Sequence, residues 1–253
     1  MPRAKAAARK ALEIDGTLPE AHTSLAFVKW QYDWDWVGAE KDFQRALEVN
    51  PGYATAHHWY AYQLITQGRK EHALREIRLA QELDPLSLII NTDLGEILCY
   101  AGRYDEAIQQ SKQTLEMDPS FTLARRVLGW TYARKGMHAE SIAELQKAMA
   151  ISGSRADLLM SLAYSYAMAG KRVEARAVLA QMKTLYGPSP DIAFGLAVAY
   201  AAAGEKDRAF ASLDKAYRER SASMVLVGVT PVLDPLRTDP RFAALLRRVG
   251  LPP

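Results

Sequence analysis

The sequence has no excess of charge of one sign and almost no cysteine. In 253 residues, 32 Lys and Arg stand against 29 Asp and Glu, so the formal net charge is only +3. Nucleic-acid-binding domains usually carry clustered basic residues, so this balance argues against nucleic acid as the partner. The single cysteine, Cys99, excludes an intramolecular disulfide and is typical of a reducing compartment.

Long apolar runs are also missing. The longest, at about 192–203, falls short of the roughly 20 residues that a membrane-spanning helix needs. The basic N-terminus, Met1–Lys10, is not followed by the apolar stretch of a secretory signal. We therefore predict no membrane insertion and a cytoplasmic location, or a place in the soluble part of a larger, anchored protein.

Motifs of catalysis and of cofactor binding are absent as well. There is no Gly-x-Gly-x-x-Gly, no phosphate loop and no His-Glu-x-x-His. His57 and His58 point about 100° apart on a helix, so they cannot chelate one metal as an i, i+4 pair would, and we expect the histidines on helix surfaces. Cys99 is expected to be a small buried or groove residue rather than a nucleophile. These absences predict a protein without catalytic activity, metal or cofactor.

What the sequence does contain is a repeat with a period of 34 residues. Five columns of residues recur in one phase along most of the chain. Small residues form three columns: Ala61, Gly95, Gly129, Ala163 and Ala197; Ala39, Ala73, Ala107, Ser141, Ala175 and Ala209; and Ala46, Ala80, Thr114, Ala148, Met182 and Ala216. Glycines form a fourth at Gly68, Gly102, Gly136, Gly170 and Gly204, and helix breakers a fifth at Pro51, Pro85, Pro119, Gly153 and Gly187.

Each repeat predicts a pair of helices. Between breakers lie two segments with apolar residues at i, i+3, i+4 and i+7, for example about 54–67 and 70–83. The glycine between them suits the left-handed conformation that ends a helix, and the later proline stops the second helix. Small residues allow the paired helices to approach closely. The pattern predicts an all-α chain.

This unit resembles the tetratricopeptide repeat. Its characteristic residues appear as Leu94-Gly95 with Leu98, Leu128-Gly129 with Tyr132, Ala73 and Ala107 on second helices, and Pro85 and Pro119 at the unit ends. The resemblance covers nearly the whole chain. It implies a right-handed superhelical solenoid of antiparallel helix pairs, in which several units must stack to bury their apolar faces.

Six units start near residues 19, 54, 88, 122, 156 and 190 and span 19–223. Residues 1–18 are interpreted as an orphan second helix of a truncated repeat, so we expect the parent protein to extend further N-terminally. In the first unit Asp33-Trp34-Asp35-Trp36 replaces the usual Gly-x-Tyr, and this unit is one residue longer. Residues 224–253 are expected to form an irregular segment and a capping helix over the last repeat. The stretches 33–36 and 233–242 resemble repeat tails of bacterial winged-helix or kinase-type regulators.

The resemblance implies that first helices line a concave, partner-binding groove. The residues predicted to line it are Phe27, Trp30, His58, Tyr62, Thr66, Glu96, Tyr100, Arg126, Trp130, Arg134 and Tyr164. Arg126, Trp130 and Arg134 stand at i, i+4 and i+8, one stripe on one helix. Such a stripe suits an acidic side chain or a C-terminal carboxylate, with Trp130 packing on an apolar group. The alternative is that Trp130 packs between helices and the arginines are simply solvated.

We therefore predict a non-catalytic scaffold that binds a protein or an extended peptide in an open groove, free of the chain's own tail. The alternative is self-association, or a spacer role in a larger regulatory protein. It rests on apolar surface that Trp34, Trp36 and the orphan helix would leave at one end. A nucleic-acid partner has only Arg125, Arg126 and Arg134 near aromatic residues in its favour.

Overall fold

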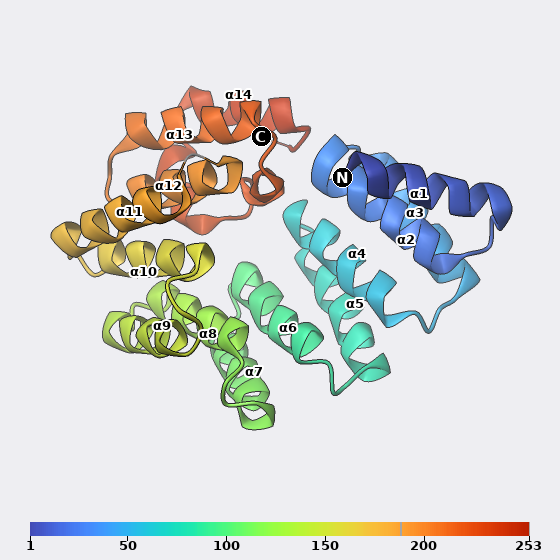
Figure 1. The fold of residues 1–253 in the computed structure, drawn as a ribbon, viewed down its shortest axis with the longest axis horizontal. Coiled ribbons are helices and arrows are strands. Elements are labelled where there is room, and N and C mark those ends of the chain that lie inside the picture. Colours follow the sequence, from blue (N-terminus) through green and yellow to red (C-terminus); the bar gives the residue numbers. More distant parts are fainter. Residues whose placement is uncertain (188, 253) are drawn as a thin grey trace.

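A computed structural model describes residues 1–187 and 189–252. These residues form α-helices joined by loops and by short 3-10 and π turns. The helices are stacked as antiparallel pairs (Figure 1). The helix α1 (Pro2–Ile14) precedes six pairs. Their first helices are α2 (Pro19–Val28), α4 (Ala54–Thr66), α6 (Leu88–Ala101), α8 (Thr122–Arg134), α10 (Ala156–Met168) and α12 (Pro190–Ala202). Their second helices are α3 (Trp36–Val49), α5 (Lys70–Leu83), α7 (Tyr104–Met117), α9 (His138–Ser152), α11 (Arg172–Tyr186) and α13 (Lys206–Arg218). The predicted all-α solenoid of helix pairs is confirmed.

The small-residue columns lie where paired helices touch. A Cβ on Gly129 of α8 would lie 2.8 Å from Leu145 Cγ and 3.2 Å from the Ser141 carbonyl oxygen on α9. Ala61 and Ala163, in the same column, are fully buried. A larger side chain at these positions would force the two helices apart, which explains why the column is restricted to Gly and Ala.

The glycine column ends the first helices. Its five members have φ between 73° and 88°, the left-handed region that glycine adopts without a Cβ clash. In the first pair Trp34 takes this place with φ 58°, at a cost of about 1 kcal/mol for a residue with a side chain. The extra residue of this unit is absorbed just before it by η1 (Lys29–Asp33), a turn of π-helix.

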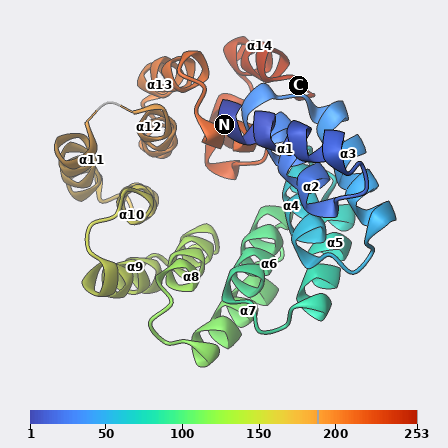
Figure 2. The ribbon, with the colours of Figure 1, turned by 45° about the vertical axis from the view of Figure 1, so that its right-hand side comes forward.

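The solenoid curves until its two ends meet (Figure 2). The end of the last helix, α14 (Pro240–Val249), reaches the start of α3, where the buried Trp36 Nε1 donates to the Val249 carbonyl oxygen at 2.9 Å. Trp34 packs against Tyr217 with ring centroids 5.2 Å apart. The expectation that Trp34 and Trp36 leave an apolar surface at one end is wrong, because the far end of the chain covers both.

The C-terminal segment does two things. Helix α14 lies on the last pair, where Arg241 stacks on Phe210 and Arg248 stacks on Tyr217, as expected of a cap. Before it, η2 (Ala222–Leu226) and η3 (Pro231–Leu236) run along the concave side, against α12 and η1. Along this segment the side chains of Met224, Val227, Leu233 and Leu236 are fully buried. The predicted groove free of the chain's own tail is therefore wrong, since burial of this apolar segment against the first helices is favourable.

Candidate binding groove

The N-terminal part of the concave surface is aromatic and covered. Phe27 meets Trp30 edge-on at 5.8 Å, and Trp30 lies 6.4 Å from Tyr62 between ring centroids. Val225 and Leu226 of η2 lie opposite Trp30 and Tyr62 across a cavity of about 180 Å³. The buried Thr66 donates its hydroxyl to the Gln63 carbonyl of its own helix at 2.7 Å, so it is not turned toward a ligand.

The centre of the groove is a closed polar network. The buried His58 Nε2 lies 2.6 Å from Asp93 Oδ2. Tyr62 and Arg126 both donate to Glu96 Oε2, each at 3.1 Å. Arg126 Nε also lies 3.8 Å from Asp157 Oδ2. Two carboxylates of the chain therefore engage the Arg126 guanidinium, which leaves little of its charge for a partner.

Neighbouring charges and burial raise the pKa values of both Arg126 and Tyr62 in this network. Burial opposes the charged form of Arg126, but Glu96 and Asp157 more than offset it and raise its pKa above the ordinary value. Burial, and then the charges of Asp93 and Glu96, raise the pKa of the Tyr62 hydroxyl well above its usual range. Arg126 thus stays charged and Tyr62 stays protonated across the physiological pH range.

Trp130 is mostly enclosed. Only 8% of its surface is exposed, and it meets Tyr100 edge-on with centroids 5.0 Å apart. Tyr100 is also buried. These two rings pack the first helices α6 and α8 together, which agrees with the alternative that Trp130 lies between helices.

Arg134 differs from Arg126, although both belong to α8. Its Nη2 donates to the Tyr104 hydroxyl at 2.8 Å, and its guanidinium stacks on the rings of Tyr104 and Trp130. Its Nε and Nη1 are buried without an acceptor among the described protein groups. In the part of the chain that the structure describes, no carboxylate oxygen lies within 4.0 Å of the Arg134 guanidinium, the distance limit for an ion pair.

A cavity of about 250 Å³ adjoins this guanidinium. Tyr164 and Met168 of α10 line it together with Val232 and Asp234 of η3. Burial raises the pKa of Tyr164 to about 12, so its hydroxyl is neutral. The Asp234 carboxylate accepts a 2.6 Å hydrogen bond from Arg237. The cavity therefore combines the Arg134 guanidinium, which has no carboxylate partner, with largely apolar walls and one carboxylate, Asp234, that is already paired with Arg237.

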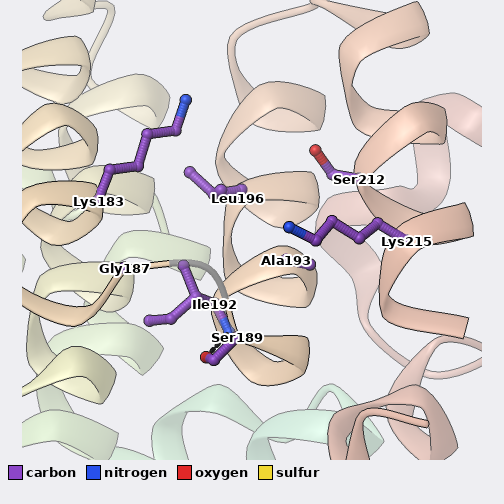
Figure 3. A pocket seen from close by; sticks show the side chains of 8 residues that line it. All are labelled: Lys183, Gly187, Ser189, Ile192, Ala193, Leu196, Ser212 and Lys215. Carbon is purple, nitrogen blue, oxygen red and sulfur yellow. Dashed lines mark hydrogen bonds between the residues drawn. The ribbon is translucent and has the colours of Figure 1, made fainter. Parts of the chain in front are cut away.

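A second cavity, of about 270 Å³, lies outside the groove between α11, α12 and α13 (Figure 3). Ile192, Ala193 and Leu196 form its apolar floor, and Lys183 and Lys215 stand on either side. Lys183 Nζ donates to the Tyr200 hydroxyl at 3.1 Å, and Lys215 Nζ lies 3.9 Å from Glu219. Since both ammonium groups have partners, this cavity is a weaker candidate than the one at Arg134.

The histidines and the cysteine carry no catalytic arrangement. The expectation of surface histidines is wrong for His57 and His58, which are both buried; His57 Nδ1 lies 2.6 Å from Glu76 Oε2. Cys99 is fully buried, as expected, and burial raises its pKa to about 11, which is unfavourable for a nucleophile. Among the described residues, no group of three His, Cys, Asp or Glu side chains could hold a metal ion. No helix in the described part of the chain combines the length and apolar content that crossing a membrane requires.

The residues that pair with the predicted site residues were not predicted from the sequence. Asp93, Asp157 and Tyr104 complete the environment of His58, Arg126 and Arg134. Their positions carry a signal: Asp93 lies 35 residues after His58, and Tyr104 lies 30 residues before Arg134. Separations of about one repeat place side chains on neighbouring first helices or at their ends, where they meet.

Comparison with known proteins agrees with this fold. The sequence model of the tetratricopeptide repeat family matches residues 35–87 and 92–156, a little under half of the chain. No curated protein sequence matches the chain at a significant level.

Solved structures with low sequence identity share the architecture. A tetratricopeptide repeat protein from Parabacteroides merdae superposes with a TM-score of 0.69 at 18% identity, over 97% of this chain and 91% of that one. Human IFIT1, in its dimer with m7Gppp-AAAA, superposes with a TM-score of 0.65 at 17% identity, over 98% of this chain and 64% of that one. A thermophilic TPR protein from Thermus thermophilus gives 0.56 at 24% identity, over 77% and 99%. The family model matches the middle of the chain, and the likeness to these structures along nearly all of it shows an all-helical solenoid with the fold of tetratricopeptide repeats.

Proposed function

We propose that this chain is a non-catalytic scaffold that holds a segment of another protein on its concave surface, and that Arg134 anchors a carboxylate of that segment. The supporting observation is the half-buried Arg134 guanidinium, whose Nε and Nη1 have no protein acceptor and which opens on a cavity with largely apolar walls. Desolvated guanidinium groups bind carboxylates strongly and in a defined geometry. Tyr164 and Met168 would pack on the adjoining apolar side chain of the ligand.

A peptide array tests this directly. Peptides ending in a free carboxylate, and the same peptides amidated at the C-terminus, are presented to the wild-type protein and to Arg134→Gln. We expect retained peptides to lose about tenfold or more in affinity on amidation or on substitution of Arg134, because a buried charged hydrogen bond is removed.

Arg75→Gln is the matched control, because Arg75 is an exposed arginine on the second helix α5. It should bind the peptides as the wild type does. Affinities that are the same for Arg134→Gln and the wild type would show that Arg134 is not the anchor.

Self-association remains the alternative function. Its support now comes from α1 alone, where Ala4, Ala7 and Ala11 line an open apolar depression of about 410 Å³ against α2. Light scattering at two protein concentrations separates the two proposals, since a strict monomer excludes self-association. The resemblance of residues 33–36 and 233–242 to the tails of bacterial regulators supports a place for this scaffold, or spacer, within a larger regulatory protein.

A further inference from the structure

The first and last pairs of the solenoid meet through contacts between residues very far apart in sequence. Trp36 Nε1 donates to the Val249 carbonyl oxygen, and Arg220 Nη1 donates to the Tyr32 carbonyl oxygen at 3.3 Å. The Arg220 guanidinium stacks on Trp34 at 4.3 Å from the ring centre. These contacts close the ring that Figure 2 shows.

The segment that reaches this junction occupies a site as a ligand would. Met224 and Val225 are buried, and Val225 and Leu226 face the Trp30 and Tyr62 rings of the first two repeats. The cavity of about 180 Å³ between them shows that the fit is incomplete. The aromatic end of the groove therefore accepts short aliphatic side chains, and here the chain itself supplies them.

Backbone strain is concentrated at the same junction. Among residues 1–187 and 189–252, the non-glycine residues with positive φ are Trp34 and Arg220, each at 58°. These two residues stack on each other. The π turn η1 directly precedes Trp34, and such turns are frequent at functional sites. Such strain persists only where the surrounding contacts hold it, and it clusters at ligand clamps and switch regions.

The segment is held more firmly at its start than at its tip. The Ser221 hydroxyl donates to Asp191 Oδ1 of α12 at 2.6 Å, which ties the start of η2 to the last pair. On the other side, the buried Nε1 groups of Trp30 and Trp34 find no acceptor among the described protein groups. The weaker side of the junction is therefore the one that faces the first repeats.

We propose that Trp30 and Tyr62, with their neighbours on η1 and α4, form a binding site for a short aliphatic segment, and that residues 222–227 occupy it in cis as a releasable latch. Release opens the ring between α3 and α14 and frees the site for an aliphatic segment of a partner. This inference goes beyond the Arg134 anchor and does not depend on it, because the two sites share no residue.

The test measures ring opening and binding in trans together. Lys41→Cys on α3 and Arg247→Cys on α14 are both exposed positions for a dye pair, while the native Cys99 is buried and stays unlabelled. The latch is weakened by Trp36→Phe with Arg220→Ala, which removes three junction contacts and leaves the aliphatic site intact. The probe is a synthetic peptide of residues 221–230, and the control peptide carries Asp in place of Val225 and Leu226.

We expect the weakened variant to show lower energy transfer than the wild type and to bind the peptide about tenfold or more tightly, because a tethered segment competes at a high effective concentration. The control peptide should not bind. Arg218→Ala, which removes a neighbouring arginine that pairs with Asp214, should behave as the wild type does.

Two results would overturn the proposal. Unchanged energy transfer in the weakened variant would make the segment a permanent cap, and an open ring that does not bind the peptide would remove the binding site. If the double variant melts before the measurement, Arg220→Gly replaces it, since glycine adopts φ 58° without strain and still removes the stack on Trp34.

Discussion

Arg126 and Arg134 lie two turns apart on one helix and have opposite environments. Glu96 and Asp157 form ion pairs with Arg126. Arg134 instead lies among aromatic rings, and within the described residues no carboxylate comes within ion-pair distance of it. Both residues are arginines, and both lie on the same face of α8. The difference arises from what the neighbouring first helices present, so each arginine has to be assigned from its contacts.

At the same scale, Gly129 gives a direct test of helix packing. Gly129→Leu should lower the free energy of unfolding by about 3 kcal/mol, because even a Cβ would lie 2.8 Å from Leu145 Cγ. Chemical denaturation measures the change. Lys147→Leu on the exposed side of α9 is the control and should stay within about 0.5 kcal/mol of the wild type. Equal stabilities would refute the close approach of α8 and α9.

Between elements, the polar network joins three first helices. Glu96 of α6, Arg126 of α8 and Asp157 of α10 form one chain of charges with little exposure. Buried ion pairs add little net stability, but loss of one partner leaves an uncompensated charge. The network is therefore best understood as a device that fixes the register of successive pairs.

A double-mutant cycle tests that role. Arg126→Leu should destabilise the protein by about 3 kcal/mol, and adding Glu96→Leu should restore much of the loss, because the Glu96 carboxylate is then no longer buried without its partner, while the more exposed Asp157 keeps its ion pair with Arg155. Urea denaturation gives the four stabilities. The exposed pair Arg45 and Glu48 serves as control, with an expected coupling below about 0.5 kcal/mol. Additive losses at Arg126 and Glu96 would contradict the assignment.

In the whole molecule, ring closure couples ends that a linear solenoid would keep independent. Each pair of an open repeat array contacts mainly its neighbours. Here Val249 accepts a hydrogen bond from Trp36, so the C-terminal cap also supports the first pair.

Deletion of residues 238–253 should therefore increase hydrogen exchange in α2 and α3, although these helices lie far away in sequence. Exchange in α6 and α7, remote from the junction, should change little and is the internal control. Protection of α2 and α3 that is unaffected by the deletion would show that closure contributes nothing to stability.

The local architecture could be predicted from the sequence because its causes are local. The columns that contain Gly129 and Gly102 report helix contacts and helix ends, which depend on steric size and backbone conformation a few residues away. The same columns mark Trp34 as the exception, in the place where every other unit has glycine. Helix pairs and their stacking followed from this pattern.

The candidate groove could be predicted only in part. The choice of first helices is supported by the positions of Arg134 and Tyr164 beside one cavity. Pairing of Arg126 and burial of His58 could not be predicted, and the choice between groove and helix packing for Trp130 stayed open, because each depends on side chains one repeat away in sequence.

The sequence alone determined the helix pairs, their period and their all-α stacking, since size, helix ends and apolar spacing act over short distances. Only the tertiary structure decided that the stack closes on itself. Small rotations between successive pairs add up over six pairs, and their sum brings α14 to α3 and places residues 222–236 in the groove. No single residue determines the total rotation, so the sequence led us to expect an open groove. The hydrogen bond between Trp36 and Val249 shows instead that the ring is closed.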